Sequence, residues 1–162
     1  MRFETERALL EDVLATWLEG GIHHIGSTAV PGLAAKPVID MMAGVRDLEE
    51  ARAAFAPLKL HSYQYTPYRP GTHHLSKPLG PWWTSTHGLH LTRPGSDLWR
   101  ERLAFRDALR ADPALAAEYA ALKVRLAKEH RNEVERYTVG KRAFVARVLG
   151  AAGLTLPPTS PR

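Results

Sequence analysis

The chain has 162 residues, 44% hydrophobic and 24% charged, which is an ordinary balance for one globular domain. The absence of cysteine excludes disulfides, thiolate metal sites and cysteine nucleophiles. The net charge of +5 favours anionic ligands, although the basic residues are scattered and the charge alternatively reflects biased composition.

No apolar run approaches the roughly 20 residues of a membrane span, and the first residues lack a signal-peptide pattern. We therefore expect a cytoplasmic protein that does not enter a membrane. The charge permits nucleic-acid binding, but no recognised motif supports it, so nucleic acid is not the expected partner.

Hydrophobic periodicity predicts the elements of the first half. Apolar residues at helical spacing predict a helix over 5–19, which Gly20 and Gly21 are expected to end. Asp47 is expected to cap a helix that runs to about Ala56. Apolar runs between turn residues predict five strands: 22–25, 38–45, 60–68, 73–77 and 87–92.

The second half is predicted to be helical, over 97–110, 113–128 and 133–149. Residues 151–162 form a Gly/Pro/Thr/Ser tail that we expect to be disordered, which leaves 1–150 as a single domain. The order of the elements predicts an α+β, layered fold: a mixed β-sheet with flanking helices and a helical C-terminal half.

The strand over 38–45 carries one charge in an apolar run, Asp40, and a buried carboxylate needs compensation. Upstream, Gly26, Ser27 and Thr28 follow a strand, where exposed backbone N–H groups can cradle a phosphate. Lys36 is placed to reach Asp40 or a phosphate. A metal-bound triphosphate would compensate Asp40, since Mg²⁺ takes one or two carboxylates plus phosphate oxygens. The alternatives are a helix-capping turn and an ion pair between Asp40 and a buried arginine.

Eight histidines are many for a chain of this length. Adjacent strand residues point to opposite faces, so each His-His pair offers one inward ring. We expect His24, His74 and His90 to converge if their strands are neighbours, as a metal site or as acid–base groups. Ordinary hydrogen-bonded histidines are the alternative.

Basic side chains of the helical half are candidates for phosphate binding. Arg106 lies in line with apolar residues, so it is expected to need an anion, either a protein carboxylate or a ligand phosphate. Lys123 and Lys141 each follow a tyrosine by four residues, which places a phenol and an ammonium on one helix face. Each lysine is therefore expected either to pack against the ring or to face a phosphate.

Residues 24–40, HIGSTAVPGLAAKPVID, resemble the signature of the GrpB family. Later segments agree with the family in order, and the resemblance covers roughly residues 10–149. GrpB proteins belong to the nucleotidyltransferase superfamily, and a related domain is appended to some dephospho-CoA kinases. The resemblance therefore implies a nucleotidyltransferase-like core.

In that superfamily, a Gly-Ser element precedes a strand with the pattern Asp-x-Asp/Glu, and a neighbouring strand supplies a third carboxylate. The resemblance places Asp40 at the first carboxylate, Met42 at the second and His90 at the third. Relatives often carry another histidine where this chain has Gly88. These departures imply fewer metal ions, a softer metal or no nucleotidyl transfer.

The leading hypothesis is a nucleotidyltransferase-like enzyme, or an ATP-dependent ligase, that binds Mg²⁺ with ATP or another nucleoside triphosphate and acts on a small-molecule acceptor. Its assigned residues are Gly26, Ser27, Thr28, Arg106, Lys123 and Lys141 for phosphate, Asp40 and His90 for metal, and Asp40, His90 and Lys36 for catalysis.

Two alternatives stay open beside that hypothesis. One is a non-catalytic module that binds a nucleotide or a phosphorylated metabolite. The other is an enzyme of different chemistry, with Asp40, His74 and His90 as acid–base groups or ligands of a transition metal. Because family members usually carry more residues before the first motif, a homodimer that supplies a missing piece is also open.

Overall fold

The computed structural model describes residues 2–33, 38–77, 85–129 and 134–154, without the side chains of 134–138. Its elements in chain order are α1 (Arg2–Val13), β1 (Leu18–Ile25), the 3₁₀ turn η1 (Ser27–Ala29), β2 (Ile39–Val45), η2 (Glu50–Ala54), α2 (Phe55–Leu60), β3 (Gln64–Tyr65), β4 (His73–Lys77), β5 (His87–Thr92), α3 (Asp97–Ala111), α4 (Pro113–Glu129) and α5 (Val134–Ala151).

Five strands form one mixed sheet in the order β1-β2-β5-β4-β3. Strands β2 and β5 pair in parallel, and the other neighbours pair antiparallel. Asp40 on β2 lies opposite Ile25 on β1 and Gly88 on β5, and His74 on β4 lies opposite His90 on β5. This register places Asp40, Gly88, His90 and His74 on one face of the sheet.

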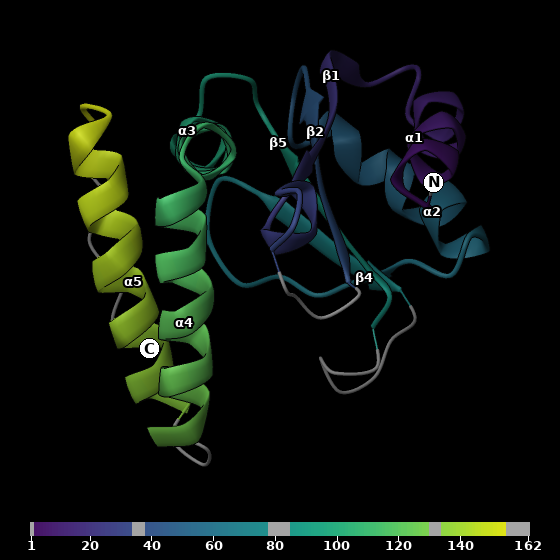
Figure 1. The fold of residues 1–162 in the computed structure, drawn as a ribbon. Coiled ribbons are helices and arrows are strands. Elements are labelled where there is room, and N and C mark those ends of the chain that lie inside the picture. Colours follow the sequence, from purple (N-terminus) through teal and green to yellow (C-terminus); the bar gives the residue numbers. More distant parts are fainter. Residues whose placement is uncertain (1, 34–37, 78–84, 130–133, 155–162) are drawn as a thin grey trace.

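The opposite face of the sheet is the main hydrophobic core. Met41, Leu89 and Leu91 are fully buried there against Leu10 of α1 and Leu58 of α2. In Figure 1, α1 and α2 lie on one side of the sheet and α3, α4 and α5 on the other. The layered α+β fold with a mixed sheet and a helical C-terminal half is confirmed.

The helical half packs on the face that carries Asp40. Ile25 and Met42 are buried there against Leu98 of α3. The three helices share a second core that reaches the segment after η1, built from Val30, Leu109, Ala116, Tyr119, Phe144 and Val148. None of the helices in the described part of the chain has the length and hydrophobicity needed to cross a membrane.

Two boundaries in the first half differ from prediction. Helix α1 ends at Val13, and Gly20 and Gly21 lie inside β1, at φ of 90° and 80°, where the pairing with β2 shifts register. Paired glycines allow a bulge in a strand as readily as they end a helix. Leu60 ends α2, which leaves only Gln64–Tyr65 of the third predicted strand.

Other predictions match closely. Strands β4 and β5 have the expected bounds. Asp47 Oδ1 accepts the backbone N–H of Glu50 at 2.8 Å, but the predicted helix to Ala56 is wrong: the 3₁₀ turn η2 follows Asp47, and α2 runs on to Leu60. Helix α5 ends in a turn, in which Leu154 N donates to Leu149 O at 2.8 Å, so residues 152–154 continue the ordered chain. The rest of the predicted disordered tail, 155–162, lies outside the described residues.

Candidate functional site

Asp40 sits over two glycines on the face of the sheet that the helical half covers. A Cβ atom on Gly88 would lie 2.7 Å from Asp40 Oδ1, and one on Gly26 would lie 2.9 Å from Asp40 Oδ2. Gly26 also has a φ of 74°, which few other residues adopt. Both carboxylate oxygens therefore occupy space that only glycine neighbours leave open.

We expect Gly88→Ala to destabilise the protein by about 1–3 kcal/mol, because the new methyl group overlaps the Asp40 carboxylate. Denaturant unfolding measures the cost. In an Asp40→Ala background the overlapping oxygen is gone, so the same change should cost at least about 1 kcal/mol less. Gly150→Ala is the control, since no atom lies within 4 Å of its Cβ position. An equal cost in both backgrounds would contradict this placement of Asp40.

The Asp40 carboxylate has little compensation. Burial raises its pKa, against the opposing charges of Arg102 and Lys141. Among the described residues, no group donates a hydrogen bond to it and no cation forms an ion pair with it. The expected alternative of an ion pair with a buried arginine is therefore not found in this part of the chain.

Three cations of the helical half surround this region. Lys123 Nζ donates a hydrogen bond to Ser27 Oγ at 2.7 Å and lies 5.0 Å from the centre of the Tyr119 ring. Burial lowers the pKa of Lys123. Burial, with the charges of Lys123 and Arg102, lowers the pKa of Lys141 to about 8, although Asp40 opposes the shift. The structure thus brings together Ser27, Asp40, Lys123 and Lys141, which the sequence had singled out separately.

Two of the three expected histidines meet beside Asp40. The His74 and His90 rings lie 4.6 Å apart, and Tyr68 packs edge-on against both. Tyr68 Oη lies 3.3 Å from His90 Nδ1. Burial, with the charges of Arg102 and His74, holds the pKa of His90 well below its ordinary value, so that ring is neutral at pH 7.

The prediction that His24 converges with these two rings is wrong. Ile25 pairs with Asp40, so Ile25 and His23 share the Asp40 face and His24 points to the other. His24 stacks on Phe3, with ring centroids 4.6 Å apart, and its Nε2 lies 2.9 Å from Thr28 Oγ1.

Several predicted phosphate ligands have protein partners. Thr28 Oγ1 donates its only proton to Val38 O at 3.0 Å, so this hydroxyl has no proton left to donate to a phosphate. Arg106 pairs with Asp107 at 2.8 Å and donates to the His24 carbonyl at 3.3 Å. The predicted need of Arg106 for an anion is met by Asp107, and its role as a phosphate ligand stays a prediction. Lys36 lies outside the described residues.

Sequence reasoning missed Arg102 and Tyr68. Arg102 lowers the pKa of Asp40, His74 and His90, so it lies where Arg106, one turn further along α3, had been expected. A signal was present, because Arg102 belongs to the same helical stripe. No pattern in the sequence marked Tyr68, because its contact with His74 and His90 depends on how the segment before β4 folds back over β5.

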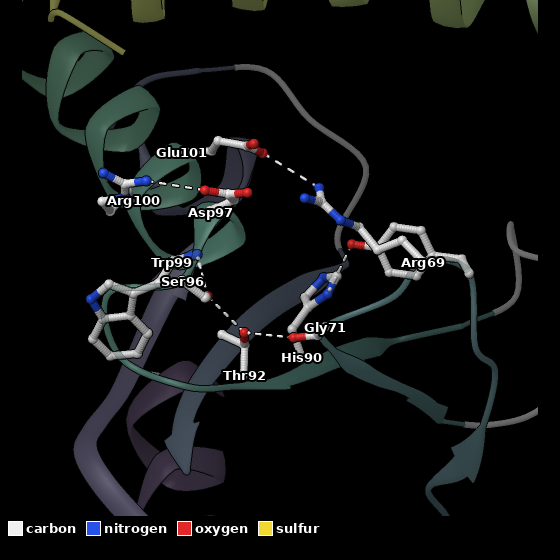
Figure 2. A network of polar contacts seen from close by, with 10 residues as sticks. Arg69, Gly71, His90, Thr92, Ser96, Asp97, Trp99, Arg100 and Glu101 are labelled. Atoms are coloured by element: carbon white, nitrogen blue, oxygen red, sulfur yellow. Dashed lines mark hydrogen bonds and ion pairs between the residues drawn. The ribbon is translucent and has the colours of Figure 1, made fainter. Parts of the chain in front are cut away.

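An ion pair ties that segment to α3. Arg69 Nη1 lies 3.4 Å from Glu101 Oε2, and Glu101 is 7% exposed. Figure 2 shows this pair above His90, with Thr92 and Ser96 joined at the base of α3. The other oxygen, Glu101 Oε1, has no partner among the described residues. Glu101 also lines a shallow hollow between the start of α3 and the end of α5, to which no residue of the Asp40 cluster contributes.

The donors near Asp40 are few. In the described part of the chain, no group of three or more histidine, aspartate or glutamate side chains is arranged to hold a metal ion. Met42, at the predicted second carboxylate position, is fully buried in the contact with Leu98 and has no access to a ligand. Any cation here would take its remaining ligands from water or a bound anion.

Comparisons with known proteins show which family the chain resembles along nearly its whole length. The model of the GrpB protein family matches residues 1–151. Glutamate-rich protein GrpB of Alkalihalophilus pseudofirmus is 33% identical over 159 residues, which cover 91% of this chain and 86% of that protein. UPF0157 protein YqkA of Bacillus subtilis is 38% identical over 128 residues, covering 76% of this chain but only 36% of YqkA.

The crystal structure of GrpB from Enterococcus faecalis matches with a TM-score of 0.81 and 33% identity, over 93% of this chain and 90% of that one. Terminal uridylyl transferase 4 from Trypanosoma brucei with bound CTP matches with a TM-score of 0.49 and 19% identity, over 95% of this chain and 51% of that one; a likeness at that level carries no information about activity. The family model and the E. faecalis structure each match nearly the whole chain, so it belongs to the GrpB protein family.

Proposed function

We propose that this protein binds a nucleoside triphosphate with a divalent cation at Asp40 and transfers the nucleotidyl group to a small-molecule acceptor. One observation carries the proposal: a carboxylate that accepts no hydrogen bond from a described residue shares its surroundings with Arg102, Lys123 and Lys141. A lone carboxylate suits a cation and clustered cations suit phosphates, so a metal-bound polyphosphate complements both.

The donor set fits a site with one carboxylate. Mg²⁺ prefers oxygen and is often held by one or two carboxylates together with substrate phosphates and water. Asp40 would hold the cation, and Lys123, which already contacts Ser27 Oγ, would lie beside the phosphates. The cation would offset part of the triphosphate charge.

Nucleotidyl transfer needs a base and stabilisation of the leaving group. An acceptor hydroxyl or amine attacks the α-phosphorus, the bond to the β-phosphate breaks, and pyrophosphate leaves. The acceptor proton passes to solvent water, since His90 is 7% exposed and engaged by Tyr68. Lys123 and Lys141 stabilise the negative charge of pyrophosphate.

Calorimetry with ATP, GTP, CTP and UTP, with and without Mg²⁺, tests the binding step, and pyrophosphate release tests the transfer. We expect Mg²⁺-dependent binding in the wild type and in Asp12→Asn, an exposed carboxylate of α1. Asp40→Asn should lose it. Equal binding or equal pyrophosphate release by Asp40→Asn would remove Asp40 from the role of metal ligand.

The low pKa of Lys141 predicts a pH dependence. The free ammonium titrates at about pH 8, and a bound phosphate would raise that pKa. Nucleotide affinity should therefore fall as pH rises above about 8, and binding there should take up a proton, which calorimetry in two buffers of different ionisation enthalpy detects.

Lys141→Met should weaken binding by about tenfold or more, the usual worth of a charge-assisted hydrogen bond, and should remove the proton uptake. Lys59→Met, an exposed lysine of α2, is the control. Proton uptake that persists in Lys141→Met would mean that another group titrates.

A non-catalytic nucleotide-binding protein is the second candidate. The burial of Met42 favours it, because the second carboxylate that the superfamily uses for metal is missing. It predicts saturable nucleotide binding without pyrophosphate release for any acceptor, whereas turnover would exclude it.

A further inference from the structure

The His74 ring has a fixed orientation, and one of its nitrogens has no hydrogen-bond partner in the part of the chain that the structure describes. Its Nδ1 lies 3.1 Å from the backbone carbonyl of Thr66 and 2.8 Å from Thr66 Oγ1. A carbonyl only accepts, so the hydrogen-bond network assigns the proton to Nδ1 and leaves a lone pair on Nε2. Imidazoles that bind metals are commonly held in this way, with the other ring nitrogen donating to a backbone carbonyl.

The free nitrogen faces the same space as Asp40. The Cβ position of Gly88 lies 3.4 Å from His74 Nε2 and 2.7 Å from Asp40 Oδ1. Neither atom receives a hydrogen bond from a described residue. Two acceptors with lone pairs thus border one small volume that the glycine leaves empty, and a cation between them would relieve their repulsion by accepting both lone pairs.

We propose that Asp40 Oδ1 and His74 Nε2 together bind a divalent cation of the borderline class, such as Mn²⁺, Co²⁺ or Zn²⁺. This inference deepens the proposed function and rests on it for the role of the cation. One oxygen and one imidazole nitrogen suit these ions better than Mg²⁺, which favours oxygen alone. With only two protein ligands, the ion keeps positions for water and phosphate oxygens.

This assignment replaces His90 by His74 as the nitrogen ligand. His90 Nδ1 contacts Tyr68 Oη, and its ring lies beside that of His74 at an interplanar angle of 49°. His74 is the less buried of the two and reaches over Gly88 toward Asp40. Tyr68 and His90 then act as positioning residues, since they hold the His74 ring from one side.

The test is titration of chelator-treated, nucleotide-free protein with Co²⁺ and Mn²⁺ by calorimetry, with the visible absorption of Co²⁺ as a second readout. We expect His74→Ala and Asp40→Asn each to weaken Co²⁺ binding by about tenfold or more. His74→Gln keeps a hydrogen-bonding side chain, so it separates the loss of a metal ligand from the loss of the fold. Its melting temperature should match that of the wild type. His61→Ala, at the end of α2, is the control and should bind as the wild type does.

The outcomes separate the two proposals. Loss of Co²⁺ binding in Asp40→Asn but not in His74→Ala or His74→Gln would overturn the two-ligand site and leave the nucleotide site standing. Loss in both, with no nucleotide bound under any condition, would support the metal site and overturn the proposed function. No binding of Co²⁺ or Mn²⁺ to the wild type, with or without ATP, would overturn the metal site, since a shared proton would then link Asp40 and His74.

Discussion

Asp40→Asn is expected to stabilise the metal-free protein by about 1–2 kcal/mol at pH 7–8, while it abolishes metal-dependent nucleotide binding. Burial raises the pKa of Asp40 more than Arg102 and Lys141 lower it, so the ionised carboxylate weakens the fold. Asparagine removes that charge in nearly the same shape. Thermal unfolding in the presence of a chelator should show a melting temperature higher by about 2–6 °C.

The pH dependence of this effect has a definite sign. A carboxyl group with a raised folded-state pKa binds its proton more tightly in the folded protein than in the unfolded chain. Its stabilising protonation is present at low pH and is lost as pH rises through the folded pKa. The gain from Asp40→Asn should therefore shrink toward pH 4, near the ordinary pKa of 3.8.

Asp12→Asn, at an exposed position of α1, is the matched control and should leave stability nearly unchanged. If Asp40→Asn lowers the melting temperature at pH 8, then Arg102 and Lys141 stabilise the carboxylate more than burial disfavours it. In that case Asp40 needs no bound cation to be tolerated in the folded protein.

Lys77→Met is expected to destabilise the protein by about 2–3 kcal/mol, because it leaves a buried carboxylate short of its cation. Glu6 Oε1 accepts hydrogen bonds from Lys77 Nζ and Tyr63 Oη, both at 2.6 Å. The side chains of Glu6 and Lys77 are only 10% and 19% exposed, so water cannot replace the lost partner. This network joins α1 to β4, and unfolding in denaturant measures its contribution.

Acid should remove the difference between Lys77→Met and the wild type. Burial raises the pKa of Glu6, but the hydrogen bonds from Lys77 and Tyr63 outweigh it and lower the pKa below 4.5. The contribution of the ion pair is therefore complete above the unfolded-state pKa and is lost as pH falls through the folded one. The difference in stability between the two proteins should shrink as the pH falls below 4.5.

An exposed ion pair provides the control for this effect. Arg52 and Glu49 lie 3.2 Å apart, but their side chains are 49% and 85% exposed. Arg52→Met should cost less than about 0.5 kcal/mol, since water screens such pairs. Equal losses in Lys77→Met and Arg52→Met would contradict the view that burial makes the Glu6 network important.

Local patterns in the sequence predicted most of the elements. Strands β4 and β5 and the three C-terminal helices follow from runs of apolar residues and from caps such as Asp112-Pro113, which depend on neighbours within a few residues. The prediction around Gly20 and Gly21 was wrong because two glycines permit both a helix end and a bulged strand. Only the pairing of β1 with β2 selects the second.

The site could be predicted in part. The sequence marked Asp40 because a single charge in an apolar strand is costly, and marked Ser27, Lys123 and Lys141 by motif and helical spacing. It could not show that Lys123 meets Ser27, because that contact spans 96 residues and depends on how α4 packs against η1.

The sequence by itself determined the family, the order of the elements and the face on which each strand residue lies relative to its neighbours. Only the tertiary structure decided which residues meet across elements. Parallel pairing of β2 with β5 set Asp40 beside Gly88, and the register of β4 brought His74 over it, while His24 went to the opposite face. Alternation fixes faces within one strand, but the register between distant strands depends on the packing of the whole core.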